Sequence, residues 1–280
     1  MPDDVRDYIF HLPEIEDHAI DPGLAALSIA SQAHPERSLD RYINHLEQLK
    51  QKTGQRFKDL LEAGAEDTAQ TRLAALKHVL HDEQGYVGDQ ETYNNIDNAD
   101  LIEVIERRKG LPVALAILYI SIGQAQGWDL KGLNFPAHFL VRLDHAGQRL
   151  IFDAFGGCQI MEAAHMRELT KSMAGQGAEL SAEYYQTVSN RAVLIRLQNN
   201  IKLRLIEAGD YKKALETVEI MRRIDPQEYR LLLDAGVLNA RIGDPKTAID
   251  LLEDYISQSP NTNDREEAAL MIRQLKETLQ

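Results

Sequence analysis

A 34-residue period in the last third of the chain constrains its fold more than any other feature of the sequence. Residues of one stretch return 34 positions later, as the pairs Gly209 and Gly243, Asp210 and Asp244, Ala214 and Ala248, and Pro226 and Pro260. Coincidences at one spacing indicate a structural unit that is repeated and stacked on itself. The C-terminal third is therefore predicted to be a repeat array, in which each unit contacts mainly its neighbours.

Each repeat is predicted to be a pair of helices joined by a tight turn. Gly209 and Gly243 mark the turns, because glycine tolerates the left-handed backbone that ends a helix. A small residue after each turn lets the two helices approach closely, and a proline stops the second helix. A third helix, from Asp264 to Leu279, is predicted to cap the stack.

The period and these positions resemble the tetratricopeptide repeat. The match is weaker in the first helix, where Lys202 replaces the small residue that Gly236 supplies one period later. The resemblance implies a protein or peptide partner that binds residues from about 195 to 280. A purely stabilising buttress is the alternative, because repeats usually need three or more copies for stability and this array is shorter.

The charge of the chain bears on the class of partner. Its 280 residues include 31 Lys and Arg against 44 Asp and Glu, which gives a formal net charge of −13. An acidic chain argues against nucleic acid or an anionic membrane surface as the main partner, because phosphate groups attract cationic proteins. The length predicts about two domains.

The cysteine content and the apolar segments bear on location and chemistry. Cys158 is the single cysteine, so neither an intramolecular disulfide nor a zinc site built from several thiolates can form. The acidic N-terminal segment lacks the apolar core of a signal peptide. The longest apolar run, from Leu111 to Ile122, is too short to span a bilayer. We therefore expect a cytoplasmic protein with no cofactor.

The middle of the chain changes its hydrophobic period from that of a helix to that of strands. A run that is apolar on every side follows Gly110-Leu111-Pro112 and predicts a buried helix. Residues 139–143 and 148–153 alternate in the strand period, with a polar hairpin loop at 144–147. These features predict an α+β domain, followed by the all-α repeats. The predicted divisions are a helical region at 1–95, a core at 96–180 and the repeats at 190–280.

The predicted hairpin brings two polar residues to one face of the sheet. If the four loop residues are unpaired, Leu143 faces Gln148, and His138 faces Asp153. Directly opposed residues point to the same side, with Cβ atoms about 4.5–5.5 Å apart. A carboxylate beside an imidazole fixes its tautomer and raises its basicity, which supplies two of the three groups of a nucleophile–base–orienter arrangement.

Four parts of the sequence carry a resemblance to a known family. They are Asn98, Arg107-Arg108-Lys109-Gly110-Leu111-Pro112, Asn134-Phe135-Pro136-Ala137-His138-Phe139 and Phe152-Asp153-Ala154-Phe155-Gly156-Gly157. A buried helix opened by a glycine turn, then a His and an Asp on successive strands, is similar to a transglutaminase-like core, a relative of the papain fold. Together with the repeats, the chain resembles the bacterial transglutaminase-like/tetratricopeptide family, which is also called Sir-B-like.

The resemblance implies a role for each matched residue. Active transglutaminase-like enzymes place a nucleophilic cysteine at the N-terminus of the buried helix, where the helix dipole lowers its pKa. His138 matches the catalytic histidine and Asp153 the orienting aspartate, whereas the cysteine position falls on Pro112. We therefore predict a catalytically silent protein, a pseudoenzyme, that binds or regulates other proteins. Its binding cleft is predicted to comprise Asn98, Pro112, Asn134, Pro136, His138 and Asp153.

Two other chemistries could use the same pair. Cys158 follows two glycines and would reach the cleft if that turn folds back, which would make the protein a cysteine-dependent acyltransferase or hydrolase with His138 and Asp153. A metal site would need Asp144 and His145 in addition. About five strand residues at roughly 3.3 Å each separate these two from the pair, which is too far for one ion. We therefore expect no metal.

Overall fold

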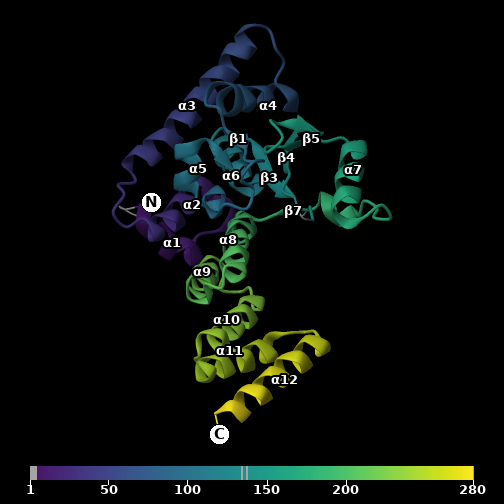
Figure 1. The fold of residues 1–280 in the computed structure, drawn as a ribbon. Helices are drawn as coiled ribbons and strands as arrows, with labels where there is room; N and C mark the ends of the chain where they lie inside the picture. The colour runs from purple at the N-terminus through teal and green to yellow at the C-terminus, as the bar shows by residue number, and fades with distance from the viewer. Residues whose placement is uncertain (1–4, 134, 137, 280) are drawn as a thin grey trace. The chain divides into compact units, whose positions relative to one another are not determined.

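The computed structural model describes residues 5–133, 135–136 and 138–279 (Figure 1). The chain divides into two compact units, Met1–Leu197 and Gln198–Gln280. The first unit combines helices with antiparallel strands, and the second is helical. This arrangement confirms the predicted fold class, an α+β region followed by helical repeats.

Most of the first unit is helical. Its helices are α1 (Tyr8–His11), α2 (Pro22–Ala33), α3 (Asp40–Glu62), α4 (Ala69–Lys77), α5 (Leu101–Arg107), α6 (Pro112–Gln124), α7 (Ala163–Ala174) and the first part of α8 (Asn190–Glu207). A π-helical turn, His78–Glu83, continues α4. Short 3-10 turns at Val5–Asp7, Leu12–Glu14, Asp17–Ala19, Ile96–Ala99 and Ala182–Tyr185 complete the helical elements.

The buried helix that the sequence predicts is α6. Its residues from Pro112 to Gly123 are all buried, because the run is apolar on every side and α2, α3 and β3 (Asp129–Leu133) pack around it. Gly123 is needed for the close approach of β3, since a Cβ atom there would lie 2.7 Å from the side chain of Leu130. α6 is therefore packed on several sides.

An antiparallel sheet of five strands packs beside α6. Its strands, in order across the sheet, are β6 (Gln159–Ile160), β5 (Gln148–Asp153), β4 (Val141–His145), β3 and β7 (Thr187–Val188). A separate parallel pair joins β1 (Val87–Gly88) to β2 (Lys109–Gly110), immediately before α6.

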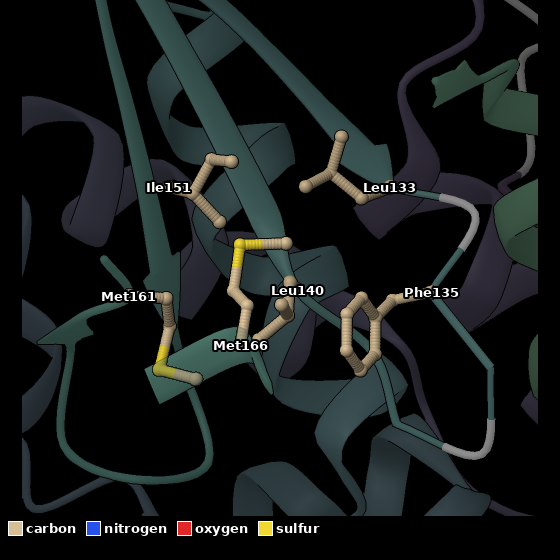
Figure 2. Packing of buried hydrophobic residues seen from close by; sticks show 6 residues of the cluster. All are labelled: Leu133, Phe135, Leu140, Ile151, Met161 and Met166. Atoms are coloured by element: carbon tan, nitrogen blue, oxygen red, sulfur yellow. The ribbon is translucent and has the colours of Figure 1, made fainter. Parts of the chain in front are cut away.

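The two faces of the sheet bury different residues. Phe152 of β5 points toward α6, where its ring lies 5.6 Å from that of Tyr119. The preceding residue, Ile151, points to the opposite face because side chains alternate along a strand. There it packs with Met166 of α7 (Figure 2). The buried residues of this second cluster are Leu133, Phe135, Leu140, Ile151, Met161 and Met166.

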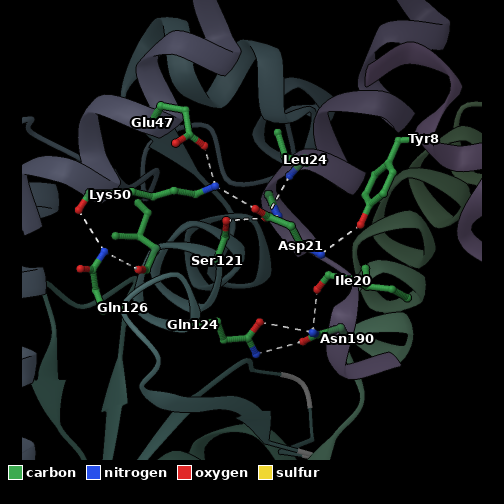
Figure 3. A network of polar contacts seen from close by, with 12 residues as sticks. Tyr8, Ile20, Asp21, Leu24, Glu47, Lys50, Ser121, Gln124, Gln126 and Asn190 are labelled. Atoms are coloured by element: carbon green, nitrogen blue, oxygen red, sulfur yellow. Dashed lines mark hydrogen bonds and ion pairs between the residues drawn. The ribbon is translucent and has the colours of Figure 1, made fainter. Parts of the chain in front are cut away.

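A polar network ties three helices of the first unit together at Asp21 (Figure 3). One carboxylate oxygen of Asp21 caps α2 by accepting from the N–H groups of Gly23 and Leu24, at 2.9 and 3.2 Å. The same oxygen accepts from the hydroxyl of Ser121 in α6 at 2.6 Å. The other oxygen pairs with the amine of Lys50 in α3 at 2.9 Å. A single N-cap side chain thus fixes the mutual positions of α2, α3 and α6.

The β4–β5 hairpin corrects the predicted register. The loop contains two residues, Ala146 and Gly147, and not four, so Leu143 pairs with Leu150 and not with Gln148. Both loop residues have positive φ, 47° and 78°, as a tight two-residue hairpin turn requires. The predicted direct opposition of His138 and Asp153 was therefore wrong, because His138 precedes β4. A shift of two residues nevertheless keeps each strand residue on its predicted face.

The second unit is a stack of helices in the predicted order. The end of α8 is followed by α9 (Tyr211–Ile224), α10 (Arg230–Ile242), α11 (Pro245–Gln258) and α12 (Thr262–Thr278). Gly209 and Gly243 have φ of 75° and 88°, so both turns use the left-handed backbone that the sequence predicts. Gly236 lets α10 approach α11, because a Cβ atom there would lie 2.8 Å from the side chain of Leu252.

None of the helices in the described part of the chain is both long and apolar enough to cross a membrane.

Candidate functional site

The structure brings His138 and Asp153 together, although not through the predicted strand pairing. Nε2 of His138 lies 3.0 Å from Oδ2 of Asp153, and the two side chains are 11% and 13% exposed. This contact does not have the geometry of a hydrogen bond. The buried Nε2 of His138 therefore has no hydrogen-bond partner among the described residues. The N–H of Phe155 donates to Oδ1 of Asp153 at 2.9 Å and holds the carboxylate in place.

A short turn positions His138 ahead of β4. Its N–H donates to the carbonyl oxygen of Pro136 at 2.8 Å. Phe135, just before, is buried in the cluster on the face of the sheet covered by α7 (Figure 2). The predicted cleft residue Asn134 lies outside the described residues.

Phe155 packs against this pair from the turn that follows β5. Its ring lies 6.2 Å from the ring of His138 and 5.9 Å from that of Tyr93, edge to face in both cases. A Cβ atom at Gly88 would lie 2.5 Å from the Phe155 ring, so the ring rests directly on the backbone of β1. Phe155 therefore fills the space between His138 and the parallel strand pair that leads into α6.

The start of α6 lies next to that strand pair. Gly88 of β1 pairs with Gly110 of β2, two residues before Pro112. The N–H of Leu111 donates to the carbonyl oxygen of Asn98 at 2.8 Å. A thiol at this helix N-terminus would become a reactive thiolate, because the helix dipole favours negative charge there. Pro112 is buried at this position and offers no nucleophile.

The side chain of Asn98 has a structural role. It is fully buried, donates to the carbonyl oxygen of Thr92 at 2.7 Å and accepts from Arg107 at 2.8 Å. These bonds use its donor and acceptor groups to hold the loop before α5 against the end of α5. Asn98 therefore reaches the predicted cleft through its backbone carbonyl.

Cys158 closes the turn between β5 and β6 and is unsuited to nucleophilic attack. Its side chain is buried, with a φ of 64°, and its N–H donates to the carbonyl oxygen of Asp153 at 2.9 Å. Burial raises the pKa of the Cys158 thiol to about 12, and the adjacent hydroxyl of Tyr119 offsets only part of that rise. A thiol with this pKa is protonated at neutral pH, whereas the thiolate is the attacking species.

The residues considered for a metal site are engaged elsewhere. Asp144 pairs with Arg142 at 2.5 Å and with Arg149 at 3.4 Å. His145 Nε2 lies 3.1 Å from the carbonyl oxygen of Asp67. Within the described ranges, no group of three or more His, Cys, Asp or Glu side chains is arranged to hold an ion.

A second, partly buried polar cluster, absent from the sequence predictions, lies before β2. The phenol oxygen of Tyr86 lies 2.8 Å from Nε2 of His45, and Arg108 Nη1 approaches the same nitrogen to 2.9 Å. Burial and the Arg108 charge lower the pKa of His45 to about 4. Arg108 has a left-handed backbone, with φ of 58°, so this contact stabilises a strained residue at the end of α5. A non-glycine residue in that conformation leaves no mark in the sequence.

The comparisons with known proteins agree with this arrangement. Residues 40–199 match the transglutaminase-like superfamily, and residues 201–273 match the tetratricopeptide repeat. A UPF0162 protein of Xylella fastidiosa (strain Temecula1) is 25% identical over 258 residues, which cover 90% of this chain and 89% of that protein. A UPF0162 protein of Vibrio cholerae is 28% identical over 191 residues, which cover 68% of this chain and 70% of that protein.

A eukaryotic protein is also similar to part of the chain. Human F-box only protein 21 is 28% identical over 176 residues, which cover 61% of this chain but only 28% of that protein. No solved structure matches the chain. The predicted resemblance, a transglutaminase-like core joined to tetratricopeptide repeats, is confirmed by the two family matches and by the bacterial relatives. The chain belongs to the transglutaminase-like superfamily.

Proposed function

We propose that this protein is a catalytically silent transglutaminase-like protein that binds or regulates another protein through its helical repeats. The observation that carries the proposal is the start of α6, where Pro112 stands in place of a thiol. The one cysteine of the chain is buried with a pKa of about 12, so it cannot replace the missing nucleophile at neutral pH. His138 and Asp153 then remain as a packed pair under Phe155.

The repeat unit offers an apolar surface that recurs with the period. Leu203 and Met271 occupy the same position in α8 and α12, two periods apart, and Val237 occupies it in α10. Leu203 is 54% exposed and Met271 is 37% exposed, while Val237 is partly exposed. Apolar side chains at equivalent positions of α8, α10 and α12 form a strip that recurs with the repeat, which favours a binding surface over isolated exposed residues.

Affinity capture from a lysate of the native host tests the binding role. The variant Leu203→Glu/Met271→Glu places two charges on the strip, and Ile242→Glu is the matched control because Ile242 is 43% exposed but lies at a different repeat position. We expect wild type and Ile242→Glu to retain the same proteins, and the double variant to lose at least one of them. Identical retention by all three proteins would contradict the proposal.

A substrate screen tests the catalytic silence. Wild type and His138→Ala are incubated with acyl and peptide substrates, and release of the acyl or amine product is measured. We expect neither protein to exceed the rate without protein. Turnover by wild type that His138→Ala abolishes would show that the protein is an enzyme and would restore the acyltransferase or hydrolase alternative.

A further inference from the structure

The outer edge of β5 is only partly covered. β6 pairs with Phe152 and Asp153 at one end of β5. Toward the hairpin turn, residues Gln148–Leu150 have β4 on one side and, within the described part of the chain, no strand on the other. Three residues at about 3.3 Å each give an open edge of roughly 10 Å.

The backbone of this edge is directed outward at Arg149. In an antiparallel strand, the N–H and C=O groups of alternate residues point to the same side. The carbonyl oxygens of Ile151 and Asp153 accept from the N–H groups of Met161 and Cys158 at 2.8 and 2.9 Å, which places the odd-numbered residues of β5 toward the outer edge. Arg149 therefore presents one donor and one acceptor to the open edge, in the spacing that a further strand would match.

A cavity of about 550 Å³ lies along this edge. That volume is within the range of known ligand sites. One wall carries apolar surface, including Ile160, which is 43% exposed. Residues around the cavity include Gln70, Gln148, Arg149, Ile160, Met161 and Tyr185.

The charge around the cavity selects the chemistry of an occupant. The side chain of Arg149 is 53% exposed. It shares the carboxylate of Asp144 with Arg142, and Arg142 lies closer to that carboxylate, at 2.5 Å against 3.4 Å. One carboxylate between two guanidinium groups leaves one positive charge unbalanced. Glu162 also lines the cavity, but its carboxylate caps α7 in a reciprocal arrangement with His165. The edge therefore favours an acidic residue opposite Arg149.

We propose that the outer edge of β5 binds an extended segment of a partner protein as an added strand that prolongs the line of β6. The segment forms main-chain hydrogen bonds with Arg149, presents an acidic side chain to its guanidinium and packs an apolar side chain against Ile160 and Met161. When a strand is added to an exposed sheet edge, main-chain hydrogen bonds supply the affinity. The side chains at alternate positions of the added strand supply the specificity. A second copy of this chain fits less well, because two arginines would meet across the new pair.

Selection from randomised octapeptides displayed on phage, with the full-length protein as the target, tests the proposal. We expect enriched sequences with Asp or Glu among apolar residues at alternate positions. Their synthetic forms should bind Arg149→Glu at least tenfold more weakly than wild type. Arg265→Glu, a charge reversal on α12, is the control and should bind as wild type does. If Arg149→Glu fails to fold, Ile160→Glu replaces it. Absence of enrichment, or equal binding to wild type and the edge variants, overturns the proposal.

Two measurements separate strand addition from contacts made by side chains alone. Methylation of the peptide nitrogen that faces Arg149 should weaken binding at least tenfold, since it removes a main-chain donor. The amide proton of Arg149 should exchange at least tenfold more slowly in the complex. Equal affinity for the methylated peptide, or unchanged exchange, overturns the proposal. So does a wild-type dimer that Arg149→Glu dissociates, because a second copy would then occupy the edge.

Discussion

At the scale of single residues, burial decides which groups of this protein can react. Cys158 and His138 both contact Asp153, from the turn after β5 and the turn before β4. Their residue types alone would suggest a thiol–imidazole pair. The thiol is buried with a pKa of about 12, and Phe155 packs over the imidazole. The environment thus disfavours the thiolate that such a pair would need.

The thiol of Cys158 should react slowly with iodoacetamide in the folded protein. A pKa of about 12, against about 8.5 for a free thiol, lowers the thiolate fraction at pH 7.5 by roughly three orders of magnitude. We expect labelling at least 100-fold slower in buffer than in denaturant, as followed by mass spectrometry. Equal rates in the two conditions would show that the thiol is accessible and ionised, and would favour the enzyme alternative.

His45 should make the stability of the first unit depend on pH. Its pKa is about 4 in the folded protein, because of burial and the Arg108 charge, and about 6.5 in an unfolded chain. Between these values the unfolded state binds the proton more tightly, so the contribution of His45 is complete above pH 6.5 and is lost as the pH falls toward 4. After allowance for solvent screening, the loss is about 1–2 kcal/mol.

Urea unfolding at pH 7, 5 and 4 measures this contribution. His45→Gln keeps an acceptor for Arg108 but removes the titration, so it should lose less stability than wild type between pH 7 and pH 4. The comparison between the two proteins cancels the carboxylates that titrate in the same range. Parallel curves for wild type and His45→Gln would contradict the assigned pKa.

The proximity of His138 and Asp153 was predicted from a strand register that was wrong. The prediction of their shared face survived because the error was two residues, and side chains repeat with a period of two. Phe155 was missed as a packing partner because its role depends on Gly88, which is far away in the sequence. Contacts of that kind are set by the tertiary fold and leave no local pattern.

At the scale of elements, strongly patterned segments were predictable and tight turns were not. α6 follows from a run that is apolar on every side, and the repeat helices follow from their period. The predicted hairpin loop was two residues too long because alanine, unlike asparagine or glycine, gives no sequence signal of the positive φ that Ala146 adopts. Local sequence specifies a turn only when its residues prefer the backbone that the turn requires.

Ala146 is therefore a site where substitution should stabilise the protein. Asparagine adopts the left-handed region more readily than alanine, so Ala146→Asn should raise the free energy of unfolding by about 1 kcal/mol. Gly147→Val has the opposite expected sign, a loss of about 1–2 kcal/mol, because a β-branched residue resists a φ of 78°. Urea titrations of the two variants provide the test, and a destabilising Ala146→Asn would contradict the two-residue turn.

At the scale of the whole molecule, the first unit is closed by contacts between its two ends. Both carboxylate oxygens of Asp17 accept from the start of α8, at 3.0 Å from the N–H of Asn190 and 2.9 Å from that of Arg191. The Asn190 side chain donates to the carbonyl oxygen of Ile20 at 3.0 Å (Figure 3). Asp17 is thus an N-cap supplied from 173 residues away. Sequence patterns reveal caps that are local, and could not have revealed this one.

Removal of this distant cap should destabilise the first unit as a whole. Asp17→Ala leaves two N–H groups at the start of α8 without their acceptor, which should lower the free energy of unfolding by about 1–2 kcal/mol. Trp128, the single tryptophan, lies buried in the first unit, so its fluorescence follows the unfolding of that unit alone. The exposed neighbour Glu16 supplies the control, Glu16→Ala. If the fluorescence midpoints in urea are the same for Asp17→Ala and Glu16→Ala, the contact between the ends does not hold the unit together.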